Sequence, residues 1–219
     1  MLLWFESNGS HRHRRVALPD STSLSCARRT LRAQLNARRR ALPPHQRALL
    51  SQRVARNADR ALRLRAGWRI ALYAALPWEL DAAPLLALAV SRGCRIYLPC
   101  IERRRASREM SFVEHGTTLR VNRLGIHEPQ GSGTIDARWL DVVFLPLVGF
   151  SRAGLRLGSG GGYYDRAFAF RQLRNAWHTP PLVGLAYAFQ EVQGLSAASH
   201  DVLLDAVVTE EGIIRCATG

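Results

Sequence analysis

The sequence contains no lysine, so all 31 of its formal positive charges are arginine. This absence excludes a Schiff base formed by a lysine side chain. It also excludes a phosphate-binding loop that ends in Lys-Ser or Lys-Thr. Phosphate groups would therefore have to be bound by arginine guanidiniums or by backbone amides.

The sequence also lacks long apolar runs and paired cysteines. No stretch approaches the roughly 20 consecutive apolar residues of a membrane-spanning helix, and the apolar start at residues 1–5 is too short for a signal sequence. The four cysteines form no Cys-x-x-Cys pair and no cluster with zinc-ligand spacing. We therefore expect a cytoplasmic protein with reduced cysteines and no membrane partner.

Positive charge is concentrated in the N-terminal third of the chain. Residues 1–69 hold 16 arginines and three acids, whereas residues 70–219 hold 15 arginines and 14 acids, and the formal net charge is +14. Such an excess is typical of proteins that bind a polyanion, either nucleic acid or a polyphosphate nucleotide. The alternative is that arginine simply occupies solvent-exposed basic positions.

The length and composition favour one compact domain, because 219 residues that are 47% hydrophobic can bury a full core. Residues 1–24 lack hydrophobic periodicity and predict a disordered basic extension. The single α/β domain is expected to run from residue 25 to residue 219. It should open with a helical hairpin, since apolar residues recur at helical spacing over residues 25–42 and residues 44–65.

Beyond this hairpin the chain alternates between strand and helix patterns. Strands are predicted at residues 70–75, 95–100, 111–114, 141–148, 182–186 and 206–209, and helices at residues 84–91 and 163–173. The connections include a charged segment at residues 102–109, loops at residues 116–136 and a Gly-rich loop at residues 149–162. Because parallel strands need long crossovers, this order predicts a three-layer αβα, Rossmann-like fold with a mostly parallel sheet. Ligands of such sheets bind beyond the carboxyl ends of the strands.

The Gly-rich loop carries the most informative motif, four glycines within residues 158–162. Glycines let the backbone approach a ligand closely and direct several N–H groups at one anion, and the start of the following helix adds partial positive charge. The run predicts a phosphate-binding loop. It is not a dinucleotide-binding fingerprint, because Tyr163 stands where the third glycine of that motif is needed.

The run from Arg156 to Arg166 resembles the signature of the 5-formyltetrahydrofolate cyclo-ligase family, also called 5,10-methenyltetrahydrofolate synthetases. Four other segments resemble the family in the same order along the chain, namely residues 28–42, 76–81, 125–129 and 200–209. The resemblance therefore extends over about residues 27–209.

The resemblance implies an ATP- and Mg²⁺-dependent ligase that converts 5-formyltetrahydrofolate into 5,10-methenyltetrahydrofolate and releases ADP and phosphate. The γ-phosphoryl group would be transferred to the formyl oxygen, N10 would attack the activated carbon, and phosphate would leave. The protein would mainly position the substrates and stabilise charge. The implied partners are ATP and a reduced folate, without nucleic acid, and we expect a monomer or a weak dimer.

The resemblance also assigns residues to ATP. The first ATP segment comprises Arg28, Arg29, Thr30, Leu31 and Arg32, with arginine at position 28 where the family usually has lysine. The second comprises Arg156, Leu157, Gly158, Ser159, Gly160, Gly161, Gly162, Tyr163 and Tyr164. Arg156 is the implied catalytic residue, and Arg156→Ala is expected to reduce turnover by orders of magnitude while leaving the fold intact. The neighbouring arginines at positions 38–40 fit a solvated basic face.

The resemblance further implies folate-binding and Mg²⁺-binding residues. The substrate-binding set is Ala74, Glu79, Ser159, Gly160, Gly161, Gly162 and Tyr163. The Glu79 carboxylate would accept hydrogen bonds from N–H groups of the reduced pterin. Asp165 and Asp201 match the Mg²⁺ positions, and Mg²⁺ favours one or two carboxylates completed by phosphate oxygens and water. Alternatively, Asp165 stabilises the first turn of a helix and Asp201 is an ordinary turn residue.

Two other functions stay open at this point. The first is a nucleic-acid-binding module that uses residues 11–69, although this stretch lacks interleaved aromatic residues and recognisable nucleic-acid-binding motifs. The second is an enzyme on a related scaffold that binds sugar phosphates in the Gly-rich loop. A requirement for a nucleotide separates the cyclo-ligase from both.

Overall fold

A computed structural model describes residues 21–101, 110–116, 118–122, 125–129, 133–173, 179–198 and 200–216. The extension expected at residues 1–24 therefore lies outside the described residues up to residue 20, and the connection expected at residues 102–109 lies outside them completely. Within the described residues, no helix is both long and apolar enough to cross a membrane. The four cysteines all lie in this part of the chain and form no disulfide bond.

Two consecutive helices open the fold, α1 (Ser21–Ala41) and α2 (Pro44–Leu62). The first helix begins at Ser21 rather than at the expected residue 25. Pro44 suits the start of α2, because its fixed φ is helical and its missing N–H would have no partner there. α2 ends at Leu62, three residues before the expected end, where Arg63 adopts a left-handed conformation with φ 52°.

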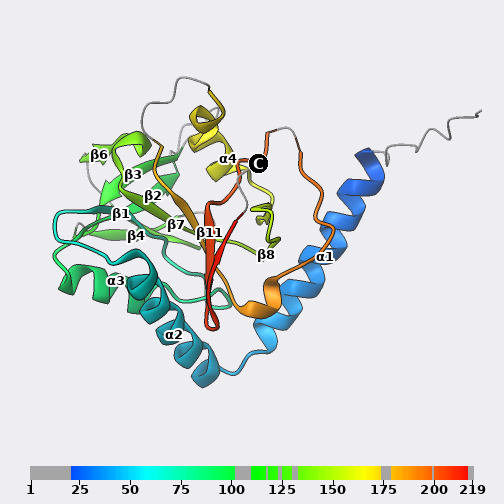
Figure 1. The fold of residues 1–219 in the computed structure, drawn as a ribbon, viewed down its shortest axis with the longest axis horizontal. Helices are drawn as coiled ribbons and strands as arrows, with labels where there is room; N and C mark the ends of the chain where they lie inside the picture. The colour runs from blue at the N-terminus through cyan, green and yellow to red at the C-terminus, as the bar shows by residue number, and fades with distance from the viewer. Residues whose placement is uncertain are drawn as a thin grey trace, which may run out of the picture.

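The two helices cover different parts of the molecule (Figure 1). Leu35 of α1 packs with Val148 and Leu157, which lie next to the Gly-rich loop. In contrast, Val54 and Ala58 of α2 pack against the central sheet. The helical pair is therefore present, and α1 extends from the sheet layer toward the Gly-rich segment.

An eight-stranded sheet forms the centre of the fold. In spatial order its strands are β12 (Gly212–Arg215), β11 (Ala206–Thr209), β10 (Leu182–Leu185), β7 (Val142–Pro146), β1 (Arg69–Ala71), β2 (Arg95–Ile101), β3 (Met110–Glu114) and β6 (Thr134–Ile135). The strands from β11 to β2 are parallel, with Ile70 of β1 aligned to both Ile96 and Val142. Antiparallel strands complete both edges. The predicted mostly parallel sheet is confirmed.

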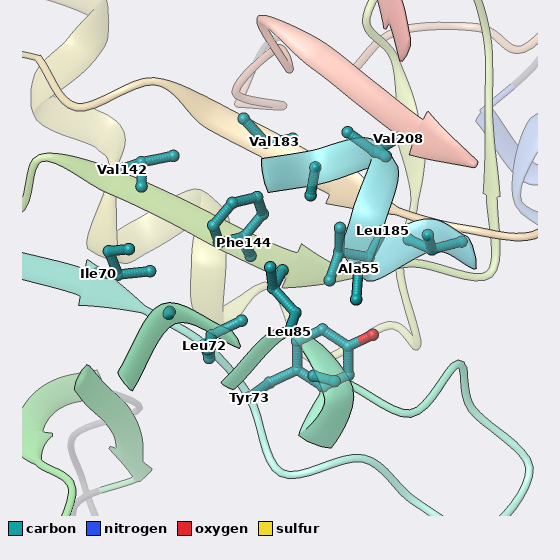
Figure 2. Close-up of a cluster of buried hydrophobic side chains, with 14 of the residues drawn as sticks. Ala55, Ile70, Leu72, Tyr73, Leu85, Val142, Phe144, Val183, Leu185 and Val208 are labelled. Carbon is teal, nitrogen blue, oxygen red and sulfur yellow. The ribbon is translucent and has the colours of Figure 1, made fainter. Parts of the chain in front are cut away.

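Helices cover both faces of the sheet. Figure 2 shows Ala55 of α2 and Leu85 of α3 (Ala83–Ser91) beside Ile70, Phe144 and Val183 of the strands. On the other face, Phe168 packs with strand residues where α4 (Tyr163–Ala167) meets the 3-10 helix η2 (Ala169–Gln172). These three layers confirm the predicted αβα architecture, and burial on both faces explains the continuous apolar runs of the strands.

Several predicted boundaries were wrong, and the neighbouring strands β1 and β7 are shorter than expected. The strand expected at residues 70–75 ends at Ala71. Leu72 N–H still donates to the Tyr97 carbonyl at 2.9 Å, and the chain beyond it leaves the sheet. The strand expected at residues 141–148 ends at Pro146, which has no N–H for the next ladder position.

Further differences concern short elements. The helix expected at residues 163–173 divides into α4 and η2 at Phe168, whose φ is −111°. The unpredicted strands are β4 (Leu119–Val121), β5 (His127–Pro129), β6, β8 (Gly149–Phe150), β9 (Arg156–Leu157) and β12. Each has only two to four residues, too few for hydrophobic alternation to reveal them. The remaining predicted elements agree with the structure to within one residue at each end.

Candidate active site

A cavity of about 660 Å³ lies at the carboxyl ends of the central strands. Tyr73 and Ala74 follow β1, Ile101 ends β2, and Pro146 ends β7, and all four residues line the cavity. Placement beyond the carboxyl ends is the position predicted for ligands of a parallel sheet. The cavity is therefore the candidate active site.

The run from Gly158 to Gly162 forms one wall of this cavity. Gly160 and Gly162 have φ values of 102° and 63°, in the left-handed region that glycine adopts most readily. None of the five backbone N–H groups in this run donates to an acceptor among the described residues. Unengaged N–H groups along a cavity wall are suited to bind the oxygens of an anion.

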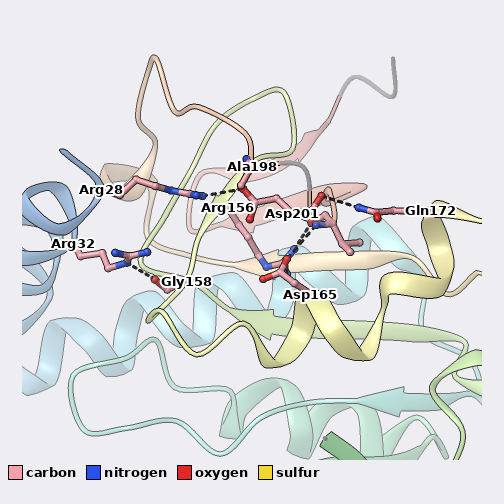
Figure 3. Close-up of polar contacts among 9 residues, drawn as sticks. Arg28, Arg32, Arg156, Gly158, Asp165, Gln172, Ala198 and Asp201 are labelled. Atoms are coloured by element: carbon pink, nitrogen blue, oxygen red, sulfur yellow. Dashed lines mark hydrogen bonds and ion pairs between the residues drawn. The ribbon is translucent and has the colours of Figure 1, made fainter. Parts of the chain in front are cut away.

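Two arginines of α1 reach this wall (Figure 3). Arg32 Nε donates to the Gly158 carbonyl at 2.8 Å, and Arg28 Nη2 donates to Asp201 Oδ2 at 3.0 Å. Arg28 Nε is buried and has no hydrogen-bond partner in the described part of the chain. Burial, together with the positive charge of Arg28, lowers the pKa of Arg32. This cluster is positively charged and retains donors for an anionic ligand.

Arg156 lies deeper, with only 7% of its surface exposed. Its Nη2 donates to Asp165 Oδ1 at 2.5 Å, and its Nη1 donates to the Val202 carbonyl. Burial lowers the pKa of Arg156, and the negative charges of Asp165 and Asp201 oppose that shift. The Arg156 guanidinium thus links Asp165, which follows the Gly-rich wall, to the segment before β11. Its positive charge lies at the cavity.

The two predicted Mg²⁺ ligands line the same cavity. Asp165 accepts through Oδ1 from Arg156 and from Val202 N–H, and Asp201 accepts through Oδ2 from Arg28 and from Ala198 N–H. Each carboxylate thus uses one of its two oxygens in these bonds. The described residues contain no group of three or more metal-ligating side chains. Two carboxylates beside an anion-binding wall fit Mg²⁺, which takes its other ligands from phosphate and water.

Glu79 lines the cavity from the turn after β1. Its Oε2 accepts from Leu76 N–H at 3.1 Å, and Arg39 Nη2 lies 3.8 Å from its Oε1. Burial raises the pKa of Glu79, and the Leu76 hydrogen bond and the Arg39 charge partly offset that effect. The Glu79 charge also contributes to the raised pKa of Tyr164 on the Gly-rich side.

The expectation of a solvated face for residues 38–40 was wrong for Arg39, which is only 2% exposed. Its Nη1 donates to the Leu147 carbonyl at 3.0 Å. Arg39 lies four residues after the buried Leu35, so the two side chains share one helix face. That spacing was the available signal, and it was missed because a run of three arginines looks uniformly exposed.

Most predicted site residues meet at this cavity. Those that line it are Arg28, Arg32, Ala74, Glu79, Arg156, the five residues from Gly158 to Gly162, Tyr163, Tyr164, Asp165 and Asp201. Arg29 and Thr30 are exposed on α1 and do not line the cavity. Leu31 and Leu157 instead pack with Leu35 and Val148. Sequence reasoning missed these lining residues: Tyr73, Leu76, Pro99, Ile101, Met110, Ile126, Glu128, Pro146 and His200.

Comparisons with known proteins agree with this geometry. The model described as the 5-formyltetrahydrofolate cyclo-ligase family matches residues 25–210. The 5-formyltetrahydrofolate cyclo-ligase of Escherichia coli (strain K12) is 36% identical over 184 residues, which cover 80% of this chain and 96% of that protein. The enzyme of the same name from Haemophilus influenzae is 32% identical over 187 residues, covering 80% of this chain and 90% of the relative.

Solved structures agree as well. The 5,10-methenyltetrahydrofolate synthetase of Aquifex aeolicus has a TM-score of 0.71 and 28% identity, covering 88% of this chain and 94% of that one. The synthetase of Mycoplasma pneumoniae has a TM-score of 0.65 and 26% identity, covering 84% and 98%. The family match, the relatives and the fold lead to one conclusion, that this chain belongs to the 5-formyltetrahydrofolate cyclo-ligase family.

Proposed function

We propose that this chain converts 5-formyltetrahydrofolate and ATP into 5,10-methenyltetrahydrofolate, ADP and phosphate. The observation that carries the proposal is the composition of the cavity. Its Gly158–Gly162 wall has unengaged N–H groups next to Arg28, Arg32 and Arg156, while the carboxylate of Glu79, whose side chain is 10% exposed, lines the same space. Such a cavity suits one polyphosphate and one ligand with several N–H donors.

The ATP phosphates would bind along the Gly-rich wall. The N–H groups of residues 158–162 would donate to phosphate oxygens, and Arg28 and Arg32 would contribute guanidinium donors from α1. Of the predicted ATP residues, Arg29 and Thr30 are exposed and Leu31 and Leu157 are packed below the wall. Leu31 and Leu157 would therefore support the wall rather than touch the nucleotide, whereas Arg29 and Thr30 do not line the cavity.

The reaction follows from placing the formyl group beside the γ-phosphate. The formyl oxygen attacks the γ-phosphorus, and the bond to the ADP oxygen breaks. N10 then attacks the formyl carbon and loses its proton to solvent, and the carbon–oxygen bond breaks to release phosphate. Arg156 would stabilise the negative charge of the phosphoryl group during its transfer, as a buried and fixed guanidinium can do.

Asp165 and Asp201 would hold Mg²⁺, since both carboxylates face the cavity and each keeps one oxygen outside its present bonds. When bound, Mg²⁺ neutralises charge on the β- and γ-phosphates. Arg28 and Arg156 already hold these two carboxylates in place, so the protein provides a preformed pair of oxygen ligands.

The folate would occupy the part of the cavity next to Glu79. The Glu79 carboxylate would accept hydrogen bonds from the pterin, and Ala74 would shape the wall by its backbone and small side chain. Ser159 to Tyr163 would lie between the two substrates, in contact with the formyl group and the γ-phosphate. A cytoplasmic location, a monomeric or weakly dimeric state and the lack of a nucleic-acid partner stay predictions.

The direct test is an absorbance assay for the methenyl product with purified protein and 5-formyltetrahydrofolate. We expect product formation only when ATP and Mg²⁺ are both present, with one ADP formed per product. Product formation without nucleotide would contradict the proposal. Tight RNA binding that weakens steeply with salt would instead favour the nucleic-acid-binding alternative.

A further inference from the structure

A second buried carboxylate belongs to the cavity. Glu128 lies on β5 and is only 3% exposed, yet it lines the same cavity as Glu79. The resemblance to the cyclo-ligase family gave this residue no role, and sequence reasoning treated its surroundings as a loop.

The contacts of Glu128 are unequal between its two oxygens. Oε1 accepts from Ile101 N–H at 2.9 Å and from Asn122 Nδ2 at 2.6 Å. Oε2 has one contact among the described residues, with Cys100 Sγ at 3.9 Å, and a thiol is a weak donor. The carboxylate is thus fixed in orientation by Oε1, and Oε2 retains most of its capacity to accept hydrogen bonds.

Glu128 also differs from the other acids of the cavity. Four carboxylates line it, and three of them have arginine partners: Glu79 with Arg39, Asp165 with Arg156, and Asp201 with Arg28. No arginine or histidine in the described part of the chain lies within 4.0 Å of the Glu128 carboxylate. A buried carboxylate without a cation is costly unless hydrogen-bond donors satisfy it.

The surroundings of Glu128 limit which ligand can supply those donors. Its neighbours in the cavity wall include Pro99, Ile101, Met110 and Ile126, whose side chains are apolar. A phosphate carries negative charge and offers acceptors, so a carboxylate repels it. The aminopyrimidinone part of a reduced pterin is flat and carries several N–H donors, which match both the apolar walls and the carboxylate.

We propose that Glu128 is a second substrate-binding carboxylate, which accepts hydrogen bonds from the N–H groups of the reduced pterin through Oε2. This inference rests on the proposed function, since it names a residue that recognises the folate substrate. Glu79 and Glu128 then lie on different elements, the turn after β1 and strand β5, and together hold the pterin. ATP contacts neither residue.

The test is Glu128→Gln, with binding of 5-formyltetrahydrofolate measured by calorimetry without ATP and with steady-state kinetics. Glutamine keeps one oxygen for Ile101 and Asn122 but offers a donor toward the pterin. We expect the Kd and the KM for the folate to rise about tenfold or more, as for loss of a hydrogen bond to a charged group. The kcat should stay within about threefold, and the KM for ATP should not change.

Two control variants separate recognition from a structural role. Glu114→Gln removes a carboxylate of β3 that is 42% exposed and pairs with Arg95 of β2, and it should leave every constant unchanged. Asn122→Ala removes a donor to Oε1 and keeps the Glu128 charge. If Glu128 only tied β2 to β5, Glu128→Gln and Asn122→Ala would both lower the Tm and leave folate affinity unchanged, and the inference would be overturned.

The outcomes also separate this inference from the proposed function. If the wild-type protein binds the folate but shows no ATP-dependent turnover, the proposed reaction fails, and a weaker Kd in Glu128→Gln still supports the inference. If the wild type turns over and Glu128→Gln has an unchanged KM and Kd for the folate, the inference fails and the proposed reaction stands.

Discussion

Arg156 combines a structural position with the proposed catalytic role in one side chain. It is buried, it bonds Asp165 and the Val202 carbonyl, and it lines the cavity beside the Gly-rich wall. The expectation that Arg156→Ala leaves the fold intact therefore needs revision. Removal of the guanidinium takes one of two donors from the half-buried Asp165 carboxylate and the Arg156 donor from the carbonyl of buried Val202.

We expect Arg156→Ala to lower kcat about 100-fold or more and to reduce the free energy of unfolding by about 1–3 kcal/mol. Arg156→Lys should recover stability more than kcat, because an ammonium keeps the charge but cannot make both bonds of the fork. Steady-state kinetics and chemical denaturation of both variants measure the two effects. A kcat near the wild-type value in Arg156→Ala would remove its catalytic role.

Glu79 should give folate binding a pH dependence. Burial raises the pKa of this carboxyl above its usual value. Below the raised pKa the carboxyl group is neutral and is a poorer acceptor, so folate affinity should fall as the pH decreases. This fall should begin at a higher pH than it would for a glutamate with an ordinary pKa. The KM for folate measured from about pH 5 to pH 8 should show this limb in the wild type, whereas Glu79→Gln should bind weakly across the range. The same limb in Glu79→Gln would assign it to another group.

At the residue scale, the sequence predicted part of the cavity lining and missed the rest. The glycines, Arg156 and Asp165 lie in the run of residues 156–166, and Asp201 lies in the segment of residues 200–209. Both stretches resemble the family, so these residues were found. Arg39 and Glu128 were missed because each becomes meaningful only through burial. Arginine and glutamate are not residue types typical of buried positions. For Arg39 the spacing from Leu35 was the one available signal, whereas the Ile101 N–H that binds Glu128 lies 27 residues away along the chain.

Among the elements, the helix α1 contributes to the site from outside the central sheet. It carries Arg28 and Arg32 to the cavity, and both arginines bond the far side of that cavity, at Asp201 and Gly158. Figure 3 shows these two side chains extending from the helix toward the Gly-rich segment. Leu35 anchors the same helix against Val148 and Leu157. Nucleotide affinity should therefore depend on how firmly α1 is packed.

Leu35→Ala tests this dependence. Leu35 is 3% exposed, so its truncation should cost about 2–5 kcal/mol of stability and should raise the KM for ATP more than the KM for folate. Leu49→Ala on α2 is the matched control, because Leu49 is 56% exposed and its loss should change stability by less than about 0.5 kcal/mol. Hydrogen exchange of α1 and both KM values provide the measurements. Equal KM values in the wild type and Leu35→Ala would show that α1 packing does not control ATP binding.

At the element scale, long periodic segments were predictable and short ones were not. The strands and helices of the β1–α3–β2 unit and the parallel centre followed from hydrophobic patterns. The β4–β5 hairpin and β12 were not predicted, because three- or four-residue strands depend on pairing partners that the local sequence does not specify. The hairpin bears on the proposed folate site, since β5 carries Glu128 into the cavity.

For the whole molecule, the excess of positive charge lies mostly outside the cavity. The cavity places three arginines near the Gly-rich wall, and four carboxylates line the same space. Many other arginines form surface ion pairs, such as Arg95 with Glu114 and Arg152 with Glu191. The basic N-terminal third lacks interleaved aromatic residues and recognisable nucleic-acid-binding motifs, so the net charge of +14 alone does not imply a nucleic-acid partner.

The working unit should not need the first 20 residues. The family match begins at residue 25, and the cavity lining extends from Arg28 to Asp201. A chain that starts at Ser21 should therefore retain kcat and both KM values within about twofold, and steady-state kinetics of the shortened chain would check this. A large loss of activity would mean that the N-terminal residues contribute to the reaction.

The central claim is that the cavity transfers the γ-phosphoryl group of ATP to the formyl oxygen of the folate. The most direct measurement uses 5-formyltetrahydrofolate labelled with ¹⁸O in the formyl group and follows the label by mass spectrometry. Our account predicts that each released phosphate carries the ¹⁸O atom and that its amount equals that of the methenyl product and of ADP. Label released as water, with ordinary phosphate formed from ATP, would contradict it.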